Sequence, residues 1–228
     1  MSDSLSEFRS ILRYKSDSLI SKYQHVDLNS PAFHEGMNEI TNLPKYKFDG
    51  VIIKNLKVNN CFYYGVVGKF LYKYQEYDYP LKWQLSSDTA TINSYKCQRA
   101  STSLGGRRYD VWFTRQLPFS NGPYKFGGLP GLIVLATDKT NSYRFELTRV
   151  YKPAKEYYIT PPDKVVMPSK PAITTTKEKY YTSYFTAKNN FIENSINSGM
   201  IRFDNEDEVR RSYQEKLKHR NNPIELKY

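Results

Sequence analysis

The stretch Gly122-Pro-Tyr-Lys-Phe-Gly-Gly-Leu-Pro-Gly-Leu-Ile133 decides the fold, and it runs directly into Val134-Leu-Ala136. Glycine opens backbone angles that other residues avoid, and proline fixes φ and removes a hydrogen-bond donor. A segment built in this way is typical of one defined bend that leads into a buried strand. It supplies no catalytic acid, base or nucleophile. The stretch therefore predicts an architecture and not an activity.

On both sides of this stretch, short runs rich in Tyr, Val, Ile and Phe predict β-strands. Gly105-Gly106 separates two such runs, and a tight primed turn needs positive φ at both central positions, so these glycines predict a hairpin. Asp138-Lys-Thr-Asn141 separates a second pair. The predicted strands cover residues 46–54, 62–67, 69–77, 81–85, 89–104, 107–117, 132–136 and 142–151.

Helical patterns lie towards the two ends of the chain. Residues 177–197 place aromatic and aliphatic side chains on one face, which favours an amphipathic helix. Residues 204–220 begin with acidic side chains and end with basic ones, an order that complements a helix dipole. Residues 5–23 predict one or two helical turns, although residues 8–14 fit a short strand equally well. The polar residues 29–44 predict a loop.

Together these elements predict a mainly β (α+β) fold. We expect a strongly bent antiparallel sheet, or a partly open barrel, of meandering hairpins with one or two C-terminal helices. Residues 1–228 are expected to form a single domain. Its segments are a polar, helical N-terminal part at 1–44, a β meander core at 45–152, a proline-rich connector at 153–176 and a helical C-terminal part at 177–228.

The charge of the chain is uneven. The 228 residues carry a net charge of +11, yet the first 50 residues are close to neutral, so the excess of Lys and Arg lies in the remainder. A cationic body favours an acidic partner, or it simply keeps a soluble protein apart from its copies. No apolar stretch is long enough to span a bilayer, and the N-terminus lacks the apolar core of a signal peptide.

The sequence offers little for catalysis. Cys61 and Cys97 are too few for a disulfide framework and lack metal-ligand spacing, so they predict either one bridge or two buried thiols. His34-Glu35 lacks the second histidine of a zinc-protease helix, and neither a nucleophile elbow nor a phosphate-binding loop is present. We therefore predict no catalytic residue, no cofactor and no metal site.

Binding is the better-supported class of function. Residues 94–125 contain six basic side chains and one acidic one, Asp110. They favour a stripe that binds an anion, and the alternative is a solvated strand face. Aromatic residues beside the rigid turn are typical interface anchors, although its glycines and leucines also fit close packing alone. The candidate ligand or partner surface comprises Lys96, Arg99, Arg107, Arg108, Trp112, Tyr124, Phe126, Gly128, Leu129, Pro130 and Gly131, with Arg115 and Lys125 as further bases of the stripe.

Several segments occur in an order that resembles the GLPGLI family, which is named for the string at Gly128–Ile133. The other segments are Asn93-Ser-Tyr-Lys-Cys-Gln-Arg-Ala100, Gly106-Arg-Arg-Tyr-Asp-Val-Trp-Phe-Thr114, Leu117-Pro118 and Asn221-Asn-Pro-Ile-Glu-Leu226. The resemblance implies a small β-rich protein of the Gram-negative cell envelope or periplasm, without an established activity.

Two features depart from the family pattern. Members usually have a signal peptide and a β segment ahead of a stretch like Ser6-Glu-Phe-Arg-Ser10, whereas this chain starts almost at that stretch. If Met1 is the native start, a cytoplasmic location follows instead. Members also often have a cysteine where this chain has Gly127, which weakens the idea of a thiol site shared by the family.

Three functions remain as hypotheses. The first is a non-catalytic envelope protein that binds an unknown protein partner or ligand, including an anionic one, through its β surface. The second is a carrier of a small lipid or peptide in a β cavity. The third is a cysteine-dependent enzyme that uses Cys97. Nucleic acid is not favoured as a partner, because tyrosines interleaved with bases mean little in a chain with 21 tyrosines.

Overall fold

The computed structural model describes residues 5–23, 25–27, 29–44, 48–152, 159–165, 171–198, 202, 204–218 and 223–227. The chain divides into two compact units that interleave along the sequence. The first takes Met1–Pro80, Asn121–Phe126 and Arg149–Thr175, and the second takes Leu81–Ser120, Gly127–Thr148 and Thr176–Tyr228. The boundary between them falls inside the Gly122–Ile133 stretch, so this stretch contributes residues to both units.

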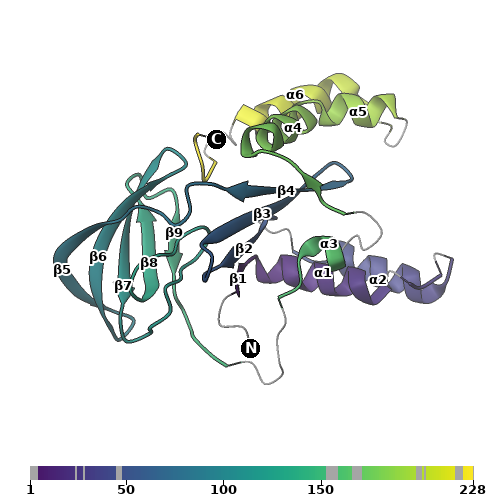
Figure 1. Cartoon of the computed structure of the whole chain (residues 1–228). Helices are drawn as coiled ribbons and strands as arrows, with labels where there is room; N and C mark the ends of the chain where they lie inside the picture. Colours follow the sequence, from purple (N-terminus) through teal and green to yellow (C-terminus); the bar gives the residue numbers. More distant parts are fainter. Residues whose placement is uncertain are drawn as a thin grey trace. The chain divides into compact units, whose positions relative to one another are not determined.

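The first unit contains a five-stranded sheet in the order β1-β2-β3-β4-β10 (Figure 1). Neighbouring strands are antiparallel, except that β10 runs parallel to β4. A cluster that includes Val51, Tyr64 and Leu71 forms a buried core. The predicted strands at 46–54, 62–67 and 69–77 correspond to β2, β3 and β4, although residues 45–47 lie outside the described part. The strands are β1 (Leu5–Phe8), β2 (Val51–Asn55), β3 (Asn60–Val67), β4 (Phe70–Glu76) and β10 (Ile173–Thr174).

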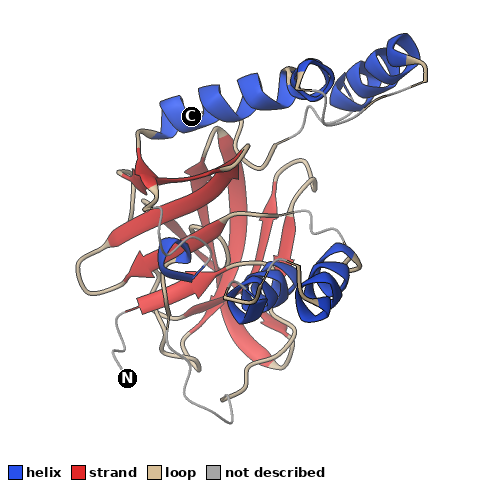
Figure 2. Ribbon diagram, turned by 90° about the vertical axis from the view of Figure 1, so that its right-hand side faces the viewer, coloured by secondary structure: helices blue, strands red, loops and turns tan. Residues whose placement is uncertain are grey.

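Helices α1 (Ile11–Tyr23) and α2 (Pro31–Thr41) lie side by side in the first unit (Figure 1, Figure 2). The loop predicted for residues 29–44 is wrong, because Pro31 begins a helix instead of interrupting one. A first-turn proline needs no N–H donor, and the Ser30 hydroxyl caps the helix by accepting from the Phe33 N–H at 3.2 Å. Gly36 permits close packing, because a Cβ at this position would lie 2.4 Å from Tyr23 Cδ2.

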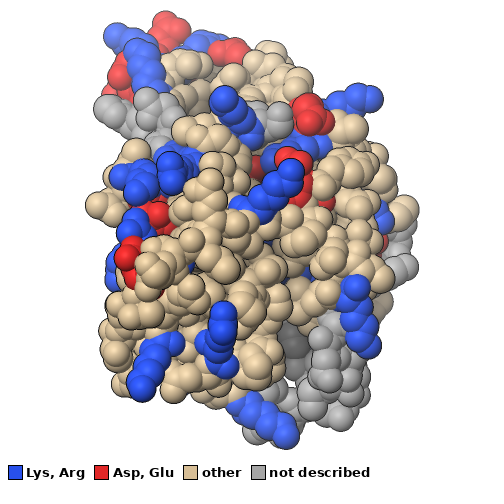
Figure 3. Space-filling model, turned by 60° about the vertical axis from the view of Figure 1, so that its left-hand side comes forward, with Lys and Arg blue, Asp and Glu red and all other residues tan. Residues whose placement is uncertain are grey.

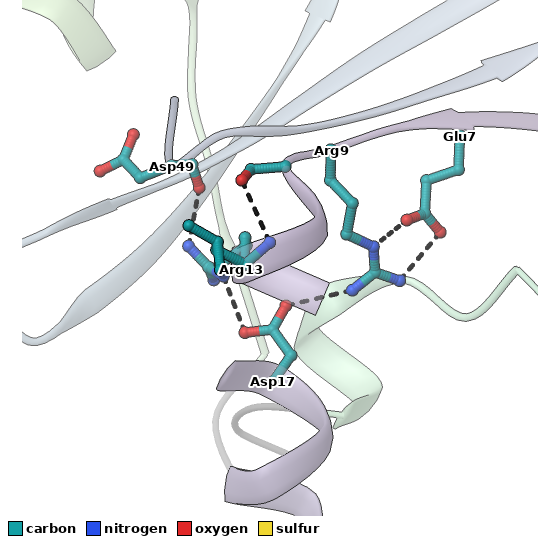
Figure 4. A network of polar contacts seen from close by, with 7 residues as sticks. Glu7, Arg9, Arg13, Asp17 and Asp49 are labelled. Atoms are coloured by element: carbon teal, nitrogen blue, oxygen red, sulfur yellow. Dashed lines mark hydrogen bonds and ion pairs between the residues drawn. The ribbon is translucent and has the colours of Figure 1, made fainter. Parts of the chain in front are cut away.

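A network of charged side chains joins β1 to α1 (Figure 4). Arg9 bonds to Glu7 at 3.0 Å and to Asp17 at 3.1 Å, and Arg13 Nε donates to the other Asp17 oxygen at 2.7 Å. Arg13 also donates to the backbone carbonyl of Asp49 at 2.7 Å, shortly before β2. Arg13 and Asp17 are buried, and mutual pairing offsets their desolvation. The helix predicted within residues 5–23 begins at Ile11. A short strand precedes it, but this strand covers residues 5–8, whereas the alternative prediction placed a strand at 8–14.

The second unit contains an antiparallel meander in the order β5-β6-β7-β8-β9 (Figure 1). Gly105 and Gly106 have φ of 54° and 79°, which confirms the predicted hairpin turn. Asn93 and Ser94, with φ of 48° and 68°, form a second turn with positive φ at both positions, so the predicted strand 89–104 is two strands. The strands are β5 (Gln84–Ile92), β6 (Tyr95–Leu104), β7 (Arg107–Thr114), β8 (Leu132–Asp138) and β9 (Arg144–Glu146).

The C-terminal part of the second unit is helical, as predicted, but with more helices than expected. The predicted helix over 177–197 is broken at Asn190, whose φ of −93° and ψ of 8° lie outside helical values, into α4 (Lys177–Asn189) and α5 (Phe191–Asn197). Helix α6 (Glu206–Lys218) packs on them. Arg210 Nε donates to Glu193 at 2.9 Å, and the Tyr213 hydroxyl donates to the Lys188 carbonyl at 2.7 Å.

The fold class is α+β, as the sequence predicts at the coarse level. The single strongly bent sheet or partly open barrel is wrong, because the strands form two separate five-stranded sheets. Of the predicted proline-rich connector, residues 153–158 and 166–170 lie outside the described part, and α3 (Pro162–Val165) lies between them. No helix among the described residues has the length and apolar character needed to cross a membrane.

Candidate functional site

The first half of the Gly122–Ile133 stretch is held inside the first unit. Lys54 Nζ donates to the carbonyl oxygens of Gly122 at 2.7 Å and Phe126 at 2.9 Å. Lys125 forms an ion pair with Glu76, donates to the Tyr74 hydroxyl at 3.2 Å and lies close to three tyrosine rings. Lys125, like Tyr124 and Phe126, is fully buried. This segment is therefore part of the buried interior of the first unit.

The second half of the stretch is packed equally tightly in the second unit. A Cβ at Gly131 would lie 2.1 Å from the carbonyl oxygen of Thr114, so only glycine fits. Leu129 is 2% exposed, and the Trp83 indole N–H donates to the Gly127 carbonyl at 2.9 Å. The sequence prediction placed four of these residues on a partner surface, and this is wrong because all four are buried: Tyr124, Phe126, Leu129 and Gly131. Gly128 and Pro130 are exposed, and Trp112 is half-buried.

Two of the predicted basic residues are occupied within the protein. Arg99 bonds to Asp88 at 3.1 Å and to Asp110 at 3.0 Å. Arg107 is buried, donates to Asp138 at 3.1 Å and donates through two nitrogens to the Pro223 carbonyl at 2.7 and 3.1 Å. Arg107 therefore holds the C-terminal segment in place and is not part of an anion-binding surface.

Three other bases of the stripe keep their charge available. Lys96, Arg108 and Arg115 are exposed, and none of them forms an ion pair with another described residue. Figure 3 shows Lys and Arg side chains spread over the face that it draws, with Asp and Glu beside several of them. Of the six bases in the predicted stripe, Arg99 is paired and Arg107 and Lys125 are buried, so Lys96, Arg108 and Arg115 are the ones that the surface presents.

Lys96 and Arg115 border a groove of about 620 Å³ on the sheet of the second unit. The strand register places Thr89, Gln98 and Phe113 side by side on one face, and Thr91 lies beside Lys96 on that same face. Phe113 is 1% exposed and forms the floor. The lining residues are Thr89, Ala90, Thr91, Lys96, Cys97, Gln98, Phe113, Arg115 and Gln116.

The end of β6 at this groove is completed by a side chain. The Lys96 N–H donates to Gln116 Oε1 at 2.7 Å, because β7 ends at Thr114 and offers no backbone partner this far along. The sequence prediction included Lys96 and the base Arg115, but it missed Gln116, Thr89 and Thr91. The signal that could have found the two threonines is the alternation of polar residues within 89–98, which places Thr89 and Thr91 on one face of their strand.

The cysteines are buried thiols and not a disulfide. Cys97 lines the groove and donates to the Tyr95 carbonyl at 3.4 Å. Burial raises the pKa of the Cys97 thiol, which outweighs a hydrogen bond from the Ile92 backbone. A nucleophilic cysteine needs the opposite shift, since the thiolate is the reactive form.

The C-terminal segment that contributes to the family resemblance is bound at the Gly105-Gly106 turn. The N–H groups of Leu226 and Lys227 donate to the Gly105 carbonyl at 2.6 and 3.1 Å. Glu225 is 1% exposed and pairs with Lys177. Asn221 and Asn222 lie outside the described residues. The segment at 223–227 is therefore bound to this hairpin turn through its backbone.

A family model described as "Protein of unknown function (Porph_ging)" matches residues 106–135. The match includes the Gly106–Thr114 segment and the Gly128–Ile133 string. A search of the curated proteins found no match. Solved structures described as "Structure of PNGF-II in C2 space group" and "Structure of PNGF-II in P21 space group" align at 16% identity with a TM-score of 0.44. Each alignment covers 67% of this chain and 27% of that chain, so this chain spans about a quarter of the length of the aligned protein.

Proposed function

We propose that the chain is a non-catalytic binding protein of the GLPGLI family, and that its groove holds an anionic group of the ligand. The family assignment is supported by the match over residues 106–135 and by the order of the other segments. A location in the cell envelope is part of the proposal and rests on the resemblance alone.

The observation that carries the proposal is the contrast between two kinds of base in the second unit. Arg99 and Arg107 are paired with carboxylates of the protein, whereas Lys96 and Arg115 border the groove without an ion pair to any described residue. Two cations at the rim of one groove raise the local concentration of an anion and favour its binding. A carboxylate, which Arg binds with two parallel hydrogen bonds, fits this arrangement.

The dimensions and floor of the groove indicate the size of the group. Ligand sites are commonly about 300–1,000 Å³ and combine apolar walls with a few polar groups. The floor at Phe113 is apolar, and Gln98 on β6 and then Thr89 on β5 follow it across the same face. A ligand that carries both a carboxylate and a small apolar group fits better than a bare ion.

Titration of the isotope-labelled chain with phenylacetate, followed by amide chemical shifts, tests this function. We expect shifts at 89–91, 96–98 and 115–116 that saturate at millimolar concentration, a range that suits a ligand of this size. A Lys96→Glu/Arg115→Glu variant should lose them. The matched control is Arg108→Glu, which changes an exposed base outside the groove and should retain them. Shifts elsewhere, or none, would reject the groove as an anion site.

A further inference from the structure

Strand β5 is an edge of the sheet in the second unit. The order β5-β6-β7-β8-β9 leaves one side of β5 without a partner strand among the described residues, and Figure 1 shows β5 at the end of its sheet. β5 has nine residues, whereas the opposite edge strand, β9, has three. A long edge strand is a template for pairing with another chain.

The register identifies which backbone groups point outward. Residue pairs in an antiparallel ladder alternate between hydrogen-bonded and non-hydrogen-bonded. Ile92 and Tyr95 flank a two-residue turn and form the closing, hydrogen-bonded pair, so Thr91 and Lys96 form a non-bonded pair. The bond from the Lys96 N–H to Gln116 agrees with this phase. The N–H and C=O groups of Thr91, and of Thr89 two residues earlier, therefore point away from β6.

β5 carries few of the features that protect an edge. Natural sheets protect their edges with lysine, proline, inward charges or bulges. β5 has neither lysine nor proline, and its one charged residue, Asp88, is paired with Arg99. A register shift between Leu85 and Thr89 protects the first half of the strand, which leaves Thr89–Ile92 as the regular, accessible ladder.

The groove lies directly beside this accessible ladder. Thr89 and Thr91 belong to both, because their side chains line the groove and their backbone groups face outward. Strands in a sheet are about 4.8 Å apart, so Lys96 on β6 lies two strand spacings from an added chain. A lysine side chain and a glutamate side chain together span that distance on one face.

We propose that the ligand is an extended acidic segment of a partner protein, which adds to Thr89–Ile92 as a sixth strand and directs its acidic side chains to Lys96 and Arg115. The proposal rests on the proposed function, since it assigns a partner to the same groove. A second copy of this chain is less suited to the site, because its net charge of +11 and its own groove cations would repel.

The test uses the full chain and a short fluorescein-labelled peptide in which Glu and Val alternate, with anisotropy as the readout. The first variant is Thr91→Pro, which removes an outward N–H and no bond of the β5–β6 ladder, a position that proline tolerates. Thr91→Val, which keeps the N–H and the branched shape, is its matched control. If Thr91→Pro fails to fold, two further peptides test the same hydrogen bonds through changes in the ligand. Each is methylated on every second backbone nitrogen, one on the odd-numbered and the other on the even-numbered residues, which gives the two methylated phases.

The expected result is that Thr91→Pro weakens peptide binding about tenfold or more, that Thr91→Val, which changes only the groove-lining hydroxyl, weakens it much less, and that only one of the two methylated peptides still binds. The amides of Thr89 and Thr91 should become protected from hydrogen exchange when the peptide binds. Lys96→Glu/Arg115→Glu should also abolish binding, whereas Arg108→Glu should retain it.

Other outcomes separate the two claims. If the groove variant loses the peptide while Thr91→Pro and both methylated peptides bind normally, the strand addition is wrong and the anion site stands. If phenylacetate and the peptide both fail to bind, both proposals fall. If the chain alone sediments as a dimer that Thr91→Pro dissociates, the occupant is a second copy and the partner assignment is overturned.

Discussion

The Nζ atom of Lys54 donates a hydrogen bond to the carbonyl oxygen of Phe126 at 2.9 Å and so joins β2 to a segment 72 residues later. A second bond, to the Gly122 carbonyl, fixes the other end of that segment. Because Lys54 is fully buried, desolvation lowers its pKa to about 7. In the first unit, residues 122–126 are therefore held by an amine whose protonated form is disfavoured by burial.

The first prediction concerns the pH dependence of stability. The unfolded chain binds the Lys54 proton up to the ordinary pKa of 10.5, whereas the folded chain releases it near pH 7. Between these values the unfolded state binds more protons, so the free energy of unfolding gains up to about 1.4 kcal/mol per pH unit from this group as pH rises. The gain is lost as pH falls towards 7.

Denaturant unfolding of wild type and Lys54→Met between about pH 7 and pH 9.5 measures this contribution. The variant should lack the rise, and Lys57→Met, which removes an exposed lysine, should keep it. The window stops at about pH 9.5 because burial raises the pKa of Tyr79 from 10.0 to about 12. Above about pH 10 the folded state keeps this proton while the unfolded state releases it, so stability falls as pH rises. Parallel curves for wild type and Lys54→Met would contradict the prediction.

The second prediction reverses a common rule for helices. An alanine in place of glycine in an exposed helix stabilises it by about 0.5–1 kcal/mol. At Gly36 the new Cβ would lie 2.4–2.6 Å from three ring atoms of the buried Tyr23. Gly36→Ala should therefore destabilise the chain by about 1–3 kcal/mol in denaturant unfolding. In a Tyr23→Leu background the same change should cost less, and an equal cost would show that the ring is not responsible.

The third prediction uses two adjacent arginines as a matched pair. Arg107→Met would leave Asp138 buried without its ionic partner and should cost about 3–5 kcal/mol, whereas the exposed Arg108→Met should stay within about 0.5 kcal/mol. Burial raises the pKa of Asp138, but bonds from Thr140 and Tyr143 and the charge of Arg107 outweigh it, so the pKa lies below 3.8. Wild-type stability from this carboxylate is thus present above pH 3.8 and is lost as pH falls.

The Arg107→Met penalty should therefore shrink in acid, where Asp138 becomes neutral in the variant. Denaturant unfolding at neutral and acidic pH measures this change. Asp138→Asn should rescue much of the loss in the double variant, because it removes the unpaired charge. A penalty that is independent of pH and of Asp138 would assign the role of Arg107 to the Pro223 carbonyl alone.

Local signals in the sequence predict the parts of this fold that depend on neighbouring residues. The glycine pair at 105–106 predicts its turn because two positive φ angles are needed there, whereas Asn93-Ser94 makes the same turn with a weaker signal. The second sheet is a meander of sequential hairpins, so its order also follows from the sequence. The loop predicted at 29–44 fails because a proline and a glycine can both be accommodated in a helix.

The candidate site was less predictable, because its charges are distinguished by distant partners. Lys125 and Glu76 are 49 residues apart, and Arg107 and Asp138 are 31 apart. Nothing in the run 94–125 shows that Lys125 and Arg107 are buried while Lys96 and Arg115 remain at the surface. That difference depends on distant partners, because Arg107 pairs with Asp138 and Lys125 pairs with Glu76, whereas Lys96 and Arg115 form no ion pair with a described residue.

The last prediction concerns the C-terminal segment and a pair of glycines with the same backbone conformation. Gly105 and Gly68 have φ of +54° and +59°, so alanine costs about 1–2 kcal/mol at either position for the left-handed backbone. A Cβ at Gly68 meets no atom within 4 Å, whereas a Cβ at Gly105 would lie 2.4 Å from Glu225 Cγ. Gly105→Ala should therefore lose more stability than Gly68→Ala and should also displace the segment at 223–227.

Hydrogen exchange separates these two effects. The Leu226 and Lys227 amides donate to the Gly105 carbonyl, so they should lose protection in Gly105→Ala and keep it in Gly68→Ala. Because Lys177 pairs with Glu225, Lys177→Met should partly reproduce the loss without touching the turn. If Gly105→Ala costs no more than Gly68→Ala and both amides stay protected, the turn tolerates the added methyl and glycine is needed there for its φ angle alone.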